Sequence, residues 1–65
     1  MCEANVYLLG KDGKEKLLLE SVDKVIPSGD DIILENIFSQ RKTVKATIKE
    51  MALVDHRIVL AERGD

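Results

Sequence analysis

Alternation of apolar and polar side chains divides the chain into short segments of strand-like length. Ala4, Val6 and Leu8 alternate with their neighbours over residues 4–9, which predicts a half-buried strand. Further strands are predicted over 17–22, 22–26, 32–38 and 58–61, and the segment 32–38 is rich in β-branched residues. The pattern therefore indicates five or six short strands.

Residues 43–53 fit two patterns. Val44, Ala46 and Ile48 follow a period of two, whereas Val44, Ile48 and Met51 also fit one face of a helix. The density of β-branched residues over 43–48 favours a strand.

Turn signals separate these segments. Asp12-Gly13 lies between apolar runs, which is a strong hairpin signal, and residues 27–30 (Pro-Ser-Gly-Asp) form a second turn. A weaker polar break is expected at 38–42, and residues 54–57 form a fourth turn that is short enough for a tight hairpin. Several antiparallel strands in 65 residues predict an all-β fold, a small SH3-like or Sm-like barrel that forms a single domain over residues 1–65.

Composition sets limits on this domain. A chain of 65 residues buries only about 60% of its unfolded surface, so the core is thin. One cysteine excludes an intramolecular disulfide, which leaves a metal or a partner subunit as the supplementary stabiliser. A lone cysteine, no signal peptide and no apolar run near 20 residues predict a cytoplasmic protein without a membrane span. The net charge of −2 argues against nucleic acid as a partner.

The chain lacks the residue sets of common catalytic sites, so we predict that it is not an enzyme. His56 is the only histidine, the four glycines lie far apart, and paired Cys-x-x-Cys spacing is missing. The Asp30-Asp31 pair is interpreted as a solvated turn. His56 fits an exposed turn residue better than a metal ligand.

Cys2 is the one chemically distinctive group. If Met1 is removed, the thiolate and the free α-amine form a five-membered chelate, and the Glu3 amide nitrogen adds a third donor. Such planar N and S donors suit Ni(II) or Cu(II). If Met1 is retained, the thiol alone remains. The alternative is structural, because Cys2 has the parity of Ala4, Val6 and Leu8 and could be the first core residue.

A binding module is the second functional hypothesis. Arg41, Lys42, Lys45 and Lys49 form the one basic stripe, with Lys45 and Lys49 expected on the outer face of a strand. An Sm-like surface could use such a stripe to bind RNA or a protein. Tyr7 and Phe38 are too few for a base-stacking platform.

Several parts of the sequence together resemble the CooT-type nickel-binding protein family. They are the start Met1-Cys2-Glu3-Ala4, the strand 5–9, the turn 11–14, the segments 22–25 and 29–34, and the closing pattern 48–60. The resemblance extends from residue 1 to about 62. It implies a small barrel that forms a homodimer and binds one Ni(II) per dimer through Cys2, as a metallochaperone. It also implies delivery to carbon monoxide dehydrogenase or another nickel enzyme, with other nickel-insertion proteins as further partners.

Overall fold

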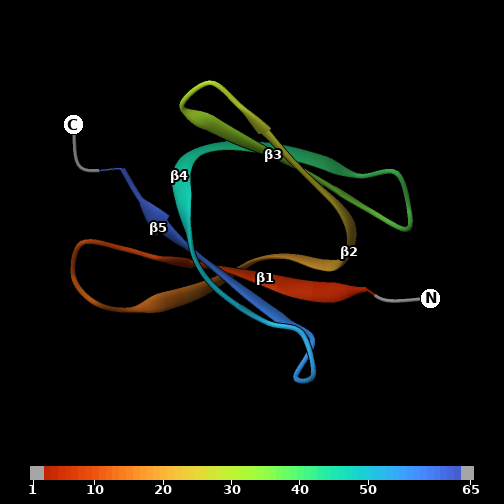
Figure 1. Ribbon diagram of the computed structural model, residues 1–65, viewed down its shortest axis with the longest axis horizontal. Coiled ribbons are helices and arrows are strands. Elements are labelled where there is room, and N and C mark those ends of the chain that lie inside the picture. The colour runs from red at the N-terminus through yellow and green to blue at the C-terminus, as the bar shows by residue number, and fades with distance from the viewer. Residues whose placement is uncertain (1–2, 64–65) are drawn as a thin grey trace.

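The computed structural model describes residues 3–63 as five strands that close into one barrel (Figure 1). The strands follow one another around the barrel in chain order and carry no helix between them within these residues. They are β1 (Ala4–Leu9), β2 (Glu15–Ser28), β3 (Asp31–Asn36), β4 (Arg41–Ala52) and β5 (Arg57–Glu62). The predicted all-β barrel is confirmed.

Hairpin connections make four of the five strand pairs antiparallel, and the closing pair is parallel. Since direction reverses at each of four hairpins, the first and fifth strands must run the same way. Asn5 lies opposite Arg57, and Leu9 lies opposite Ala61. The expectation of antiparallel pairing therefore holds for every pair except the one that closes the barrel.

β2 is one long strand where the sequence pattern indicated two. Its register slips against β1 around Leu18 and again between Leu19 and Val22, and it slips against β3 at Asp23. Each extra residue bends the strand and increases its twist. The bends let β2 pair with β1 through its first half and with β3 through its second half (Figure 1).

Ser21 lies within the irregularity between Leu19 and Val22 and has a φ of 56°. A non-glycine residue in this left-handed region is strained. Both of its backbone groups are nonetheless paired. The Ser21 amide donates to the Asn5 side-chain oxygen at 3.2 Å, and its carbonyl accepts from the Ile37 amide at 3.0 Å. The bend in β2 is thus fixed from both neighbouring elements.

The barrel interior is filled by aliphatic side chains that alternate with exposed ones. Leu34, Leu60 and Val6 are fully buried. The remaining buried members of the cluster are Leu19, Val22, Ile32, Ala46 and Ile58. Residues 41–52 alternate as a strand, which settles the ambiguity at 43–53 in favour of β structure. A core of this size leaves the two ends of the barrel to be closed by turns and polar side chains.

The β3–β4 turn is held together by one buried amide. Asn36 donates to the Gln40 side-chain oxygen at 2.7 Å, and its own oxygen accepts from the Phe38 and Gln40 amides at 3.0 and 2.9 Å. The sequence predicted a strand through Ile37 and Phe38. That boundary was wrong, because β3 ends at Asn36 and Phe38 lies in the turn with its side chain exposed.

Replacing Asn36 with alanine should lower the free energy of unfolding by about 2 kcal/mol or more, because three hydrogen bonds are lost and two backbone donors lose their partner. Gln40→Ala is the matched control, since it removes only one of these bonds and should cost less than about 1 kcal/mol. Urea unfolding at equal protein concentration measures both. Equal losses in the two variants would contradict the role given to Asn36.

Candidate functional site

The site predicted at Cys2 lies at the edge of the described part of the chain. Cys2 itself is outside the described residues, so its geometry is not assigned. Glu3 is the first described residue and is exposed. The structure shows which part of the barrel the chain contacts where it enters β1.

That surface is the β4–β5 turn. The Asn5 amide donates to the His56 carbonyl at 2.9 Å, and the His56 Nδ1 atom lies 3.2 Å from the Glu3 carbonyl oxygen. These two contacts hold the chain on either side of Ala4 to a single turn residue. We refer to them as the N-terminal latch. The lone histidine, which the sequence favoured as merely exposed, therefore lies next to the residue that follows Cys2.

The latch defines which His56 nitrogen remains available. A carbonyl oxygen only accepts, so Nδ1 carries the proton when it bonds to Glu3. In the neutral ring, Nε2 then keeps its lone pair and can bind a metal ion. His56 has a φ of 56°, a value that histidine and asparagine adopt more readily than most residues.

An apolar groove of about 250 Å³ lies beside the latch. Its lining is mostly aliphatic, with Glu3, Asp23 and His56 as the residues that carry charged or titratable groups. The aliphatic lining residues are Ala4, Val22, Val25, Met51, Leu53 and Ile58. Met51 and Leu53 are 50% and 64% exposed, and the neighbouring Val54 is 93% exposed. Several large apolar side chains therefore meet solvent at the end of the barrel where the latch lies.

The other predicted positions lie elsewhere. The Tyr7 ring is covered by the Arg57 guanidinium, whose central carbon is 4.6 Å from the ring centroid. Phe38 stands apart in the β3–β4 turn. Asp30 is exposed in the β2–β3 turn and pairs with Arg63 at 3.4 Å, whereas Asp31 is the first residue of β3. Within residues 3–63, the two aromatic side chains thus do not form a shared stacking surface.

The basic stripe divides along β4. Lys45 and Lys49 are exposed, with a register slip between Ile48 and Glu50. Lys42 is exposed as well, but it lies opposite the fully buried Leu34, so its side chain starts from the inner face of the sheet. The stripe is consequently not one surface.

The described residues contain neither a metal-binding group of side chains nor a membrane-spanning helix. Residues 3–63, a range that leaves out Cys2, hold no group of three or more His, Cys, Asp or Glu side chains arranged to bind a metal ion. They also contain no helix of the length and apolar character needed to cross a membrane.

Sequence reasoning did not connect His56 with the N-terminus. Fifty-three positions separate His56 from Glu3 along the chain, and only the parallel β1–β5 pairing brings them together. The number of strands did contain a usable signal. When an odd number of strands linked by hairpins closes into a barrel, the first and last strands must pair in parallel, which brings the start of the last strand close to the start of the first.

Comparison with known proteins identifies close similarity to one family. The family model described as "CO dehydrogenase accessory protein CooT" matches residues 1–61. A crystal structure of a CooT candidate from Carboxydothermus hydrogenoformans superposes with a TM-score of 0.88. That protein is 52% identical in sequence, and the match covers 97% of this chain and 100% of the other. No curated protein matches the chain.

Proposed function

Because this chain belongs to the CooT family of CO dehydrogenase accessory proteins, we propose that it carries Ni(II) as cargo, bound through Cys2 between two copies of the chain. The proposal includes delivery of that ion to carbon monoxide dehydrogenase or a related nickel enzyme. The observation that supports it most directly is the N-terminal latch, which holds an imidazole beside the residue bonded to Cys2.

The donor types suit the ion. Thiolate sulfur and imidazole or amine nitrogen are ligands that Ni(II) accepts, and a planar arrangement of such donors would favour Ni(II) or Cu(II) over ions that require oxygen donors. Cys2 would supply the thiolate, and its α-amine if Met1 is removed. His56 Nε2 would supply a nitrogen from the folded barrel. The role of His56 departs from the interpretation that the sequence favoured, and it rests on the 3.2 Å contact with Glu3.

An accessory role fits the architecture. The latch lies at the end of the barrel on an exposed turn, so ligand exchange with a recipient would not require the core to open. Within residues 3–63, three carboxylates form ion pairs. Glu35 pairs with Lys24 and Arg41, Glu15 pairs with Arg57, and Asp30 pairs with Arg63. Three of these pairs join residues of neighbouring or nearby strands, and the Arg63–Asp30 pair joins the residue after β5 to the β2–β3 turn.

The second copy would complete both the metal site and the core. One chain offers few donors, and the apolar groove beside the latch is available to a partner. We assign the partner as a second copy because Met51, Leu53 and Val54 form an apolar surface adjacent to the proposed metal site. Burial of such side chains contributes roughly 25 cal/mol for each Å² removed from water.

Cys2→Ser should abolish tight nickel binding while the barrel stays folded. Thiolate-to-nickel charge-transfer absorbance during titration with NiCl₂ reports the sulfur ligand directly, and far-ultraviolet circular dichroism reports the fold. The expected result is saturable absorbance in the wild-type protein and none in the variant. Equal affinity in the two proteins would contradict the assignment of Cys2.

His56→Asn should weaken nickel binding by about tenfold or more, because it removes the imidazole nitrogen while asparagine still tolerates the positive φ at this position. Asp55→Asn, in the same turn, is the matched control and should bind nickel like the wild type. Competition with a calibrated chelator gives the dissociation constants. Identical constants for all three proteins would show that His56 takes no part.

Leu53→Glu should convert the dimer to a monomer, because a carboxylate would be buried in the apolar interface. Leu17→Glu is the control, since Leu17 is also an exposed apolar residue, at 49%, but lies outside the groove. Sedimentation equilibrium over a range of protein concentrations measures both. A dimer that survives Leu53→Glu, or a wild-type protein that stays monomeric, would contradict the proposed interface.

A further inference from the structure

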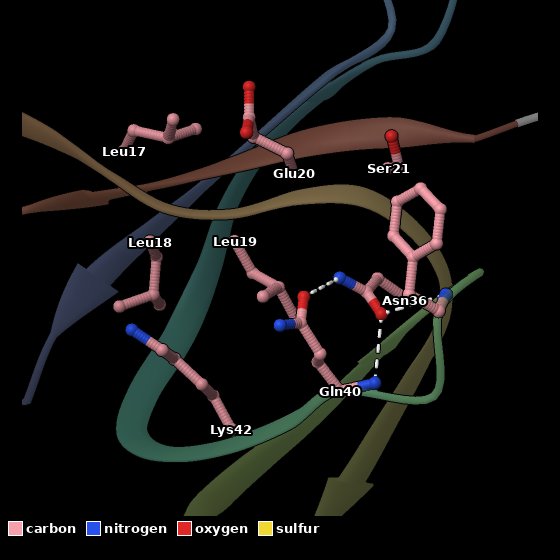
Figure 2. A pocket seen from close by; sticks show the side chains of 9 residues that line it. Leu17, Leu18, Leu19, Glu20, Ser21, Asn36, Gln40 and Lys42 are labelled. Atoms are coloured by element: carbon pink, nitrogen blue, oxygen red, sulfur yellow. Dashed lines mark hydrogen bonds between the residues drawn. The ribbon is translucent and has the colours of Figure 1, made fainter.

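A second cavity opens where the bent part of β2 faces the β3–β4 turn, and it shares no lining residue with the apolar groove beside the latch. Its volume is about 330 Å³, which is within the range of binding pockets. Leu18 and Leu19 come from β2, Asn36 and Gln40 from the turn, and Lys42 from the start of β4 (Figure 2). We call this cavity the β2–turn pocket.

Lys42 is exposed, but its position in β4 places its side chain on the inner face of the sheet, beside the pocket. It is two residues before Val44 and four before Ala46, and it lies opposite Leu34. Those three residues belong to the core or pack against it. Figure 2 shows the Lys42 side chain extending toward Leu18.

The ammonium group has no partner among the described residues. No carboxylate of residues 3–63 forms an ion pair with Lys42. Glu20 also lines the cavity, but its carboxylate points to the opposite side of β2 from Lys42 (Figure 2). Inward-pointing lysines commonly protect exposed sheet edges, yet this barrel is closed and β4 is paired on both sides.

The pocket also presents a second donor in a fixed orientation. Asn36 holds the Gln40 side-chain oxygen at 2.7 Å, which leaves the Gln40 amide nitrogen facing into the pocket near Leu19 (Figure 2). Because Asn36 is itself fixed by two backbone amides, this orientation is set by the turn. A cationic donor and a neutral donor over aliphatic walls match a carboxylate attached to an apolar group.

We propose that the β2–turn pocket binds a peptide segment of a partner protein in which a glutamate or aspartate side chain adjoins an apolar residue. The carboxylate would accept from Lys42 and Gln40, and the apolar side chain would pack on Leu18. Phe38 and Leu17, which also line the pocket, are 71% and 49% exposed and extend the apolar contact surface around its rim. That extension, with the charge complementarity at Lys42, favours a peptide over a free small carboxylate. This proposal does not depend on nickel binding.

The test uses defined probes. N-acetyl-Leu-Glu-Leu-amide is titrated into ¹⁵N-labelled protein, with N-acetyl-Leu-Gln-Leu-amide as the uncharged analogue and isovalerate as the small carboxylate. The expected result is saturable shifts of the Gln40 side-chain amide and the 38–40 backbone amides with the glutamate peptide. The glutamine peptide and isovalerate should each bind about tenfold more weakly or worse.

Lys42→Met isolates the charge because methionine keeps much of the apolar stem. It should weaken binding of the glutamate peptide by about tenfold, whereas Lys45→Met, on the outer face, should leave it unchanged. Thermal unfolding of both variants controls for stability. The proposal is overturned if shifts at residues 38–40 are absent or unaffected by Lys42→Met, if the glutamine peptide binds equally, or if isovalerate binds as tightly as the peptide.

Discussion

The parallel pairing of β1 with β5 is the constraint on which the rest of the molecule depends. It closes the barrel, and its register places Asn5 opposite Arg57. The residue before Arg57 is therefore brought to the start of β1, where its backbone and its ring both contact the N-terminal segment. A shift of this pairing by one residue would turn the side chains of β5 to the other face, which the buried Ile58 and Leu60 oppose. Core packing thus positions the latch.

In this small barrel, one long strand also pairs with one neighbour over its first half and with the other neighbour over its second half. β2 does so through irregularities in register, and the strain at Ser21 is compensated by two hydrogen bonds, one that its amide donates to the Asn5 side chain and one that its carbonyl accepts from the Ile37 amide. Asn5 is itself part of the latch through its amide. One residue of β1 therefore links the bend in β2 to the turn that carries His56. Through its side chain and its amide, Asn5 connects Ser21, which lines the β2–turn pocket, with His56, which lines the apolar groove.

Much of this fold is predictable from local patterns, and the parts that are not have identifiable causes. Alternation over 4–9, the Asp12-Gly13 turn and the β-branched run at 43–48 each predicted the observed structure, because each depends on neighbouring residues alone. Gly13 takes the positive φ that the hairpin requires, 81°. Bulges depend on partner strands, so the single bent β2 was predicted as two strands. The inner-face position of Lys42 was missed because residues 38–42 were predicted to be a polar break, whereas β4 begins at Arg41. The proximity of His56 to Glu3 depends on pairing between the two ends of the chain.

The central claim is that two copies of the chain share one nickel ion at their N-terminal latches. Native mass spectrometry of the protein after addition of NiCl₂ and removal of excess metal tests it most directly, because it counts chains and ions in the same particle. The account predicts a species of two chains with one nickel, which disappears in the Cys2→Ser protein. Nickel found on single chains at one ion each, or two-chain species that retain nickel without the thiol, would contradict it.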